Sequence, residues 1–342
     1  MNTSLFPSQL TEALLRRQPL LTSLHAEGTN AYRIFHGIAE GVPGLTIDRY
    51  GPLVLVQSFR EPFLPDELTA IENALREKLT HSFAFAYNHR SKSSTQSFDQ
   101  WHQPQPEALA EFQCQEFGTS YLLRARHPGI DPWLFLDLRA GRRFLRDRVK
   151  GLSVLNLFSY TCSIGITAAT AGAREVWNVD FSSSNLDVGR RSAALNALNT
   201  LPPAQFLTLE QDCWPVMRQL AGLPVGGRSA RSRKYTHFQP RLFDWVILDP
   251  PAWAKSPFGA VDVAGDYPSL FKPALLATRP EGGHIMAVNH LPSVELEAWL
   301  GILRRCATKA GRSIRSIEVI SPEADFPSFD GNHPLKIAVC EI

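Results

Sequence analysis

An acidic residue and two prolines follow an apolar run in the second half of the chain. Residues 246–248 are branched and apolar, which predicts a buried strand, and Asp249, Pro250 and Pro251 come directly after them. Proline lacks an N–H and fixes φ, so we expect the chain to leave the sheet there as a loop with free carbonyl groups. Trp253 adds a flat ring two residues later. A carboxylate, rigid carbonyls and an aromatic ring at one strand end suit a planar group that carries an amine, such as a nucleobase.

Polar residues also follow three other predicted strands, at residues 153–157, 175–180 and 205–210. Asp180 ends the second strand and can accept hydrogen bonds from two ribose hydroxyls, whereas Asp212 follows the third and can accept from an adenine amino group. Ligands of open α/β sheets bind at the carboxyl ends of the strands, so these residues predict a nucleotide site. The turn after the first strand supplies Phe158, Ser159, Tyr160, Thr161 and Gly165.

Two nucleotide cofactors fit such an edge, NAD and S-adenosylmethionine. The NAD fingerprint G-x-G-x-x-G lets the backbone approach a pyrophosphate, but the turn here has only Gly165, in the last glycine position. S-adenosylmethionine has no pyrophosphate and does not need that approach. The acid after the third strand and the loop at Asp249 also suit it better. The residues therefore favour the methyl donor, with an NAD oxidoreductase as the alternative.

Strands and helices alternate from about residue 150 onward, which is typical of a parallel sheet covered by helices on both faces. Two further strands of this alternation are predicted at 244–249 and 284–288, and two final strands, antiparallel to each other, at 313–320 and 335–341. The predicted helices are 165–172, 184–198, 213–221, 267–278 and 293–310.

The first part of the chain predicts a smaller α+β domain, because its strands are short and are separated by glycine and proline turns. Its helices are predicted at 7–17 and 64–79, its strands between 31 and 57 and at 83–87, a polar loop at 91–106, and a hairpin at 112–126. The predicted domains are therefore 1–128 and 129–342.

The composition excludes several classes of protein. The 342 residues are 44% hydrophobic and 20% charged, as in globular proteins, and no apolar run is long enough to cross a membrane. The start of the chain lacks the pattern of a signal peptide. Five scattered cysteines without a CxxC pair argue against zinc and disulfides and predict a reducing cytoplasm. The net charge of +2 means that nucleic acid would have to bind through local patches.

Four arginines provide one such patch. Arg139, Arg142, Arg143 and Arg146 share one face of a predicted helix, and like charges on one stripe favour an anionic partner such as RNA phosphate. A solvated face with acidic neighbours is the alternative. A second basic run lies before the strand at 244–249, where a solvated insertion is the simpler interpretation. It contains Arg228, Arg231, Arg233, Lys234 and Arg241.

Several motifs together are similar to those of a known family. They are residues 135–139 (Phe-Leu-Asp-Leu-Arg), residues 155–161 (Leu-Asn-Leu-Phe-Ser-Tyr-Thr), Asp180, Asp212 and residues 249–251 (Asp-Pro-Pro). The chain resembles, over residues 28–342, the class I ribosomal RNA methyltransferases that include the large-subunit cytosine-C5 enzyme I and guanine-N7 enzyme K. The resemblance implies a Rossmann-like, mostly parallel seven-stranded sheet with an antiparallel C-terminal hairpin. It also implies S-adenosylmethionine as cofactor, ribosomal RNA as partner, and an N-terminal domain that helps to hold RNA.

The sequence departs from this family in three places. No segment corresponds to the N-terminal PUA domain of the cytosine enzyme, and Cys162 replaces a glycine of the cofactor turn. The third departure concerns the chemistry, because the cytosine enzyme carries a cysteine after its fifth strand and this chain has Asn289 and His290 there. Cytosine C5 needs a thiolate that adds to C6, whereas a ring nitrogen has its own lone pair and needs only placement. The sequence therefore favours methylation of a ring nitrogen over C5.

Three residues at these departures have different predicted roles. Asn289 is predicted to contact the edge of the target base, whereas His290 is expected to be hydrogen-bonded structure. Cys162 could supply an alternative thiol, although a small buried residue in the glycine position is the simpler interpretation.

The combined prediction is a cytoplasmic S-adenosylmethionine-dependent methyltransferase that requires no metal and binds no membrane. Asp249, Pro250 and Asn289 are its predicted catalytic residues, and Pro251 and Trp253 its predicted contacts to the base. The alternatives are a methyltransferase of a small molecule or protein, and a non-catalytic RNA-binding factor that keeps the fold. The sequence is compatible with a monomer or a homodimer.

Overall fold

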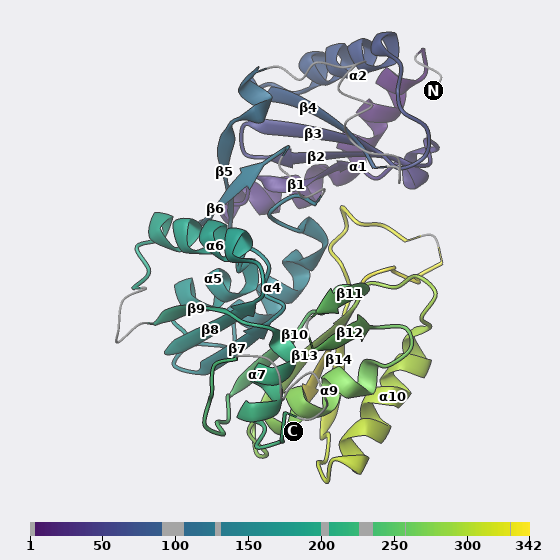
Figure 1. The fold of residues 1–342 in the computed structure, drawn as a ribbon. Helices are drawn as coiled ribbons and strands as arrows, with labels where there is room; N and C mark the ends of the chain where they lie inside the picture. The colour runs from purple at the N-terminus through teal and green to yellow at the C-terminus, as the bar shows by residue number, and fades with distance from the viewer. Residues whose placement is uncertain are drawn as a thin grey trace. The chain divides into compact units, whose positions relative to one another are not determined.

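The computed structural model describes residues 4–90, 106–126, 131–199, 205–225, 235–256, 258–328 and 330–342. The chain forms two compact units, each of which has its own sheet (Figure 1). The N-terminal unit comprises Met1–Arg139 and Pro322–Gly331, and the C-terminal unit comprises Ala140–Ser321 and Asn332–Ile342. The boundary predicted after residue 128 lies outside the described residues and stays a prediction. The return of 322–331 to the first unit was not predicted from the sequence.

The N-terminal unit contains a four-stranded sheet in the order β1-β2-β3-β4. β1, β2 and β3 are antiparallel neighbours, whereas β4 runs parallel to β3 because helix α2 connects them. A separate hairpin pairs β5 with β6, as predicted. The elements are α1 (Phe6–Ala26), β1 (Ala31–Phe35), β2 (Leu45–Tyr50), β3 (Leu53–Ser58), α2 (Pro65–Lys78), β4 (Ala84–His89), β5 (Glu111–Glu116) and β6 (Thr119–Arg124).

Both helices of the N-terminal unit bury an apolar stripe against its sheet. Phe6 and Leu10 of α1 and Ile71 and Leu75 of α2 belong to one core with the strand residues. Helix α1 is longer than the predicted 7–17 because it continues through Pro19. The predicted loop at 91–106 lies, apart from residue 106, outside the described residues.

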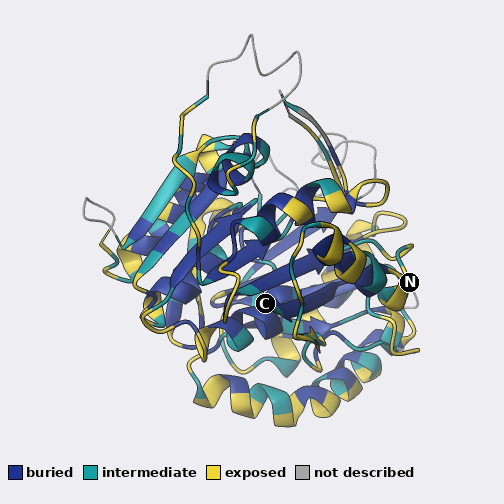
Figure 2. Ribbon diagram, turned by 90° about the horizontal axis from the view of Figure 1, so that it is seen from below, coloured by how far each residue is buried: buried dark blue, intermediate teal, exposed yellow. Residues whose placement is uncertain are grey.

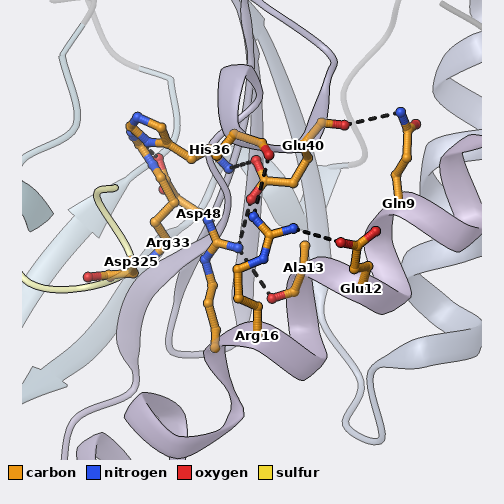
Figure 3. Close-up of polar contacts among 11 residues, drawn as sticks. Gln9, Glu12, Ala13, Arg16, Arg33, His36, Glu40, Asp48 and Asp325 are labelled. Atoms are coloured by element: carbon orange, nitrogen blue, oxygen red, sulfur yellow. Dashed lines mark hydrogen bonds and ion pairs between the residues drawn. The ribbon is translucent and has the colours of Figure 1, made fainter. Parts of the chain in front are cut away.

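Buried polar contacts tie α1 to the turn after β1 (Figure 3). Glu40 accepts a hydrogen bond from the backbone N–H of His36 at 2.9 Å, and its carbonyl accepts one from Gln9 at 3.1 Å. Its carboxylate also pairs with Arg17 at 2.8 Å, with both side chains at most 3% exposed. A paired and buried carboxylate of this kind orders the turn without leaving an uncompensated charge.

The segment at 322–331 is held in the N-terminal unit by arginines. Asp325 accepts a hydrogen bond from Arg139 at 2.6 Å and one from the backbone N–H of Arg33 at 3.0 Å. Arg139 also donates to Glu323 at 2.8 Å, and Arg33 forms a two-bond pair with Asp48 (Figure 3 shows Arg33, Asp48 and Asp325). Burial opposes the charge of Arg139, but Asp325 and Glu323 outweigh it and raise the pKa of Arg139.

The C-terminal unit contains a seven-stranded sheet in the order β14-β15-β13-β10-β7-β8-β9. The five strands from β13 to β9 are parallel, and β15 is antiparallel to both β13 and β14. This is the predicted mostly parallel sheet with an antiparallel C-terminal hairpin. The strands are β7 (Ser153–Leu157), β8 (Glu175–Asp180), β9 (Phe206–Glu210), β10 (Trp245–Leu248), β13 (His284–Asn289), β14 (Ser316–Ile320) and β15 (Lys336–Glu341).

Helices cover the sheet of the C-terminal unit, and its strands β7, β8, β10, β13 and β15 are largely buried (Figure 2). Alternate strand residues, such as Leu155 and Val246, join one core with α7, α9 and α10. On β13 and β15, Met286 and Ile337 lie next to Gly141 of α4. The helices are α4 (Arg139–Arg146), α5 (Ser163–Thr170), α6 (Ser183–Leu195), α7 (Cys213–Leu220), α9 (Tyr267–Leu276) and α10 (Leu296–Lys309).

A short hairpin follows the two prolines after β10. Its strands are β11 (Trp253–Ser256) and β12 (Gly259–Asp262), which pair antiparallel and form a separate two-stranded sheet. The predicted open loop is therefore only the short stretch that contains Pro250 and Pro251. In the described part of the chain, no helix is long and apolar enough to span a membrane, and no group of three or more metal-binding side chains is found.

Candidate active site

The predicted site residues meet at one edge of the seven-stranded sheet. The turn at residue 158 follows β7, Asp180 ends β8, Asp212 lies two residues beyond β9, Asp249 follows β10, and Asn289 ends β13. These five strands are parallel neighbours, so their carboxyl ends lie side by side (Figure 1). The topology thus brings together residues that lie far apart in the sequence, as expected for an open α/β sheet.

The turn after β7 has an unusual backbone. Phe158, Tyr160 and Cys162 have φ values of 57°, 49° and 62°, a left-handed conformation that disfavours residues with a side chain. Hydrogen bonds hold the turn in place. The N–H of Tyr160 donates to Asp180 at 2.9 Å, and the N–H of Cys162 donates to the carbonyl of Ser159 at 2.7 Å. A turn held so firmly presents backbone groups in a fixed arrangement, which suits a cofactor site.

Asp180 links this turn to the start of α6. Its second carboxylate oxygen accepts a hydrogen bond from the N–H of Ser182 at 2.9 Å. Burial raises the pKa of Asp180, while the N–H groups of Ser182 and Tyr160 act in the opposite direction. Each carboxylate oxygen has a further lone pair, so Asp180 can still accept bonds from a ribose. Phe181, the next residue, is 58% exposed and offers a flat face at the same place.

Two glycines of the C-terminal unit allow close packing around the turn. A Cβ atom at Gly165 would lie 1.9 Å from Oδ1 of Asn178 on β8, so this helix position must lack a side chain. A Cβ atom at Gly189 of α6 would lie 2.6 Å from the sulfur of Cys162. Gly165 therefore serves helix–strand packing, and Cys162 fills the space that Gly189 leaves.

Asp212 is the N-cap of α7 and carries an acceptor that has no partner. Its Oδ1 accepts a hydrogen bond from the N–H of Trp214 at 2.8 Å. Its Oδ2 is buried and has no hydrogen-bond partner among the described residues. A buried carboxylate oxygen without a donor is costly unless a ligand supplies one. An adenine amino group would do so, which makes the edge a good fit for an adenosine-containing cofactor.

Asp249 and Asn289 occupy the part of the edge on the far side of β7 from Asp180. Asp249 is paired with His290, with 2.6 Å between Oδ1 and Nε2. Asn289 is 1% exposed, its Oδ1 accepts from the N–H of Leu291 at 2.9 Å, and its buried Nδ2 has no acceptor in the described parts of the chain. Trp253 is 60% exposed at the start of β11. This region thus offers a carboxylate, an amide donor and an open aromatic face.

The predicted exposed stripe of arginines is only partly present. Arg139 and Arg142 are fully buried, so neither can contact RNA phosphates, whereas Arg143 is half-buried and Arg146 is exposed. The reason is that the guanidinium group of Arg139 lies against Asp325 and Glu323, as described above. In the second basic run, Arg241 pairs with Glu175. Its other members, Arg228, Arg231, Arg233 and Lys234, lie outside the described residues.

Comparison with known proteins identifies the family. A family model described as S-adenosylmethionine-dependent methyltransferase matches residues 32–226. The chain belongs to this family. S-adenosylmethionine is therefore its cofactor, which decides against NAD. The site at the sheet edge can hold that cofactor through the turn at residue 158, Asp180 and Asp212, and the cofactor supplies the methyl group.

Relatives of this methyltransferase share most of its length. Ribosomal RNA large subunit methyltransferase I of Aeromonas salmonicida is 26% identical over 330 residues, which cover 94% of this chain and 76% of the relative. The protein of the same name from Escherichia coli strain SMS-3-5 is 25% identical over 303 residues, covering 88% of this chain and 71% of the relative.

Solved structures share the fold of this methyltransferase. The structure of SMU.776 complexed with SAH has a TM-score of 0.78 at 22% identity, and covers all of this chain and 82% of that one. A SAM-dependent methyltransferase from Agrobacterium tumefaciens has a TM-score of 0.60 at 16% identity. The match covers 92% of this chain and 90% of that one.

Replacing Cys162 with Ala is expected to leave the turnover of this methyltransferase unchanged. The thiol is fully buried, and burial raises its pKa to about 12, so almost no thiolate forms near neutral pH. Steady-state methylation by the variant checks this, with thermal unfolding as a control for the loss of buried sulfur. A loss of turnover at unchanged stability would assign the thiol a chemical role.

Proposed function

We propose that this methyltransferase acts on a base of the large-subunit ribosomal RNA. The names of its relatives support this substrate, and so does the extent over which they match it. The observation that carries the proposal is the composition of the edge around β10. There, a carboxylate, two prolines and an exposed tryptophan follow β10, whose end lies beside the strand ends that carry the predicted cofactor residues. Hydrogen-bonding groups and an aromatic face are what enzymes use to hold a flipped-out base.

The proposal divides the site residues between cofactor and base. The turn residues Phe158, Ser159, Tyr160, Thr161 and Gly165, together with Asp180, Asp212 and Asp249, serve the cofactor. The base is held by Pro250, Pro251, Trp253 and Asn289, with Asp249 shared between the two ligands. Aromatic stacking contributes about 1–3 kcal/mol per base, so Trp253 is a suitable platform.

Two arginines and the N-terminal unit complete the proposal. Arg143 and Arg146 remain as candidates for phosphate contacts, because they are not fully buried. The N-terminal unit is proposed to help in positioning the RNA. These contacts would set the affinity for RNA and the position of the enzyme along it, whereas the edge around β10 would select the base.

The cysteines of the chain favour nitrogen over cytosine C5 as the methylated atom. All five cysteines are buried, and none lies on the strand end after β13, where Asn289 and His290 stand. Burial raises the pKa of Cys162 and of Cys340 to about 12, and that of Cys213 well above its usual value. Burial therefore disfavours, in all three, the thiolate that C6 of cytosine would need. A ring nitrogen needs no thiolate, so we propose a ring nitrogen as the acceptor.

Mass spectrometry of nucleosides tests the proposed substrate. Large-subunit ribosomal RNA from a strain that lacks the gene is expected to miss one methylated nucleoside that the parent contains. Purified enzyme and S-adenosylmethionine should restore it in isolated RNA. An Asp249→Ala variant, as the matched control, should not. An unchanged nucleoside profile would instead support a small molecule or a protein as the substrate, and loss of 5-methylcytidine would overturn the preference for nitrogen.

A further inference from the structure

A buried thiol joins two parts of the cofactor site in the C-terminal unit. Cys213 is the first residue of α7, directly after Asp212, and is 2% exposed. Its sulfur accepts a hydrogen bond from the backbone N–H of Phe158 at 3.1 Å and donates one to the carbonyl of Val179 at 3.3 Å. Phe158 begins the turn after β7, and Val179 precedes Asp180 at the end of β8. One side chain of α7 therefore contacts the backbone at the ends of two neighbouring strands.

The two hydrogen bonds lie where β7 and β8 stop pairing. The last pair of these strands is Leu157 opposite Val179. Beyond this pair, the N–H of Phe158 donates to the sulfur, and the φ value of 57° at Phe158 turns the chain away from the strand. A backbone N–H that leaves a sheet needs another acceptor. The thiol supplies that acceptor at the left-handed residue where the cofactor turn begins.

Packing alone does not account for these contacts. Cys213 and Cys306 belong to the same apolar core. The sulfur of Cys306 makes a longer contact, 3.8 Å to the carbonyl of Pro268 of α9, whereas that of Cys213 makes two shorter bonds with the backbone. Burial, and then the charge of Asp180, raise the pKa of Cys213 well above its usual value. The sulfur therefore keeps the hydrogen that it donates.

We propose that Cys213 is a positioning residue for S-adenosylmethionine, which holds the turn after β7 in a fixed position relative to Asp212. Asp212 precedes Cys213 in the chain, and its buried Oδ2 has no partner among the described residues. A cofactor that contacts both the turn and Asp212 binds best when the two are already correctly spaced. The thiol acts through the backbone of Phe158 and Val179, and its role does not depend on which substrate is methylated.

The test measures the binding of S-adenosylmethionine to four forms of the intact protein by isothermal titration calorimetry. They are the wild type, Cys213→Ala, Cys213→Ser, and Cys306→Ala as the matched control from the same core. Cys213→Ala should weaken binding about tenfold, which corresponds to about 1.4 kcal/mol. Cys213→Ser should stay within about threefold of the wild type, because a hydroxyl can accept from Phe158 and donate to Val179. Cys306→Ala should keep the wild-type affinity, although it also removes a buried group and should lower the melting temperature.

Amide hydrogen exchange, followed by NMR without cofactor, tests the proposed cause. The amide of Phe158 should be protected in the wild type and in Cys213→Ser, and should exchange faster in Cys213→Ala. The wild-type measurement also decides if Cys213→Ala does not fold. Protection of this amide supports the inference, and exchange as fast as in an unfolded chain overturns it.

The remaining outcomes separate the hydrogen bonds from packing. If Cys213→Ala and Cys306→Ala bind S-adenosylmethionine equally well, the inference is overturned and Cys213 only fills the core. Equal losses of affinity in Cys213→Ala and Cys213→Ser also overturn it, because the size of the sulfur would then matter instead of its bonds. These measurements need no RNA, so a failure of the proposed function leaves their result unchanged.

Discussion

Replacing Asp325 with Asn is expected to lower the free energy of unfolding by about 3–5 kcal/mol, the range for breaking a buried ion pair. Asp325 is fully buried and accepts hydrogen bonds from the guanidinium of Arg139 and from the backbone of Arg33. The amide removes the negative charge but keeps the shape. Arg139, also fully buried, would then lose its ion pair with Asp325 and keep the one with Glu323. The segment 322–331 should separate from the N-terminal unit first.

Urea unfolding measures the loss, and hydrogen exchange in β1 locates it. Asp330→Asn is the matched control, because Asp330 is an exposed carboxylate in the same segment and should change the stability by less than about 0.5 kcal/mol. The double variant Arg139→Met, Asp325→Leu should regain most of the lost stability, since it removes both charges. A loss of less than about 1 kcal/mol in Asp325→Asn would show that the pair is not what holds the segment.

The strands and helices of the C-terminal unit could be predicted because their signals are local. Short apolar runs such as 246–248 and the alternation with helical segments specify β7 to β10 and β13 without knowledge of distant contacts. The hairpin β11–β12 was missed because the two prolines were taken to lead into an open loop. Proline ends the strand before it but does not prevent a new strand from starting a few residues later.

The burial of Arg139 within the predicted arginine stripe could not be predicted, because helical spacing carries no information about distant partners. The four arginines do share a face by spacing, but the partner of Arg139 is Asp325, 186 residues further along the chain. Asp325 lies in the segment that connects β14 to β15. These two strands are antiparallel neighbours in the sheet of the C-terminal unit. No local pattern shows that such a segment belongs to the other unit.

The sequence predicted those features of the candidate site that depend only on the order of the strands. Acids at strand ends could be placed at one edge because parallel strands share their carboxyl ends. The bond between Asp249 and His290 could not be predicted, because it depends on β10 and β13 being neighbours in register. Phe181 was also missed, although an aromatic residue directly after a strand-end acid is a signal that the sequence contains.

Replacing Asp180 with Ala is expected to weaken the binding of S-adenosylmethionine by about a hundredfold or more, which corresponds to about 2.7 kcal/mol. The carboxylate supports the left-handed turn through Tyr160 and the start of α6 through Ser182. Hydrogen bonds to a charged group contribute about 1.5–3 kcal/mol each, so losing both would release the turn as well as the contact to ribose. Isothermal titration calorimetry with the purified protein measures the effect directly.

Glu210→Gln is the matched control for Asp180. Glu210 lies opposite Asp180 in the pairing of β8 with β9, ends its own strand and is exposed. Its replacement should change the dissociation constant by no more than about twofold, as expected of a surface position. Asp180→Asn should fall between the two, because the amide keeps one acceptor oxygen but donates at the other position. If Asp180→Ala and Glu210→Gln bind S-adenosylmethionine equally well, the turn is held by its own backbone and the ribose is bound by other residues.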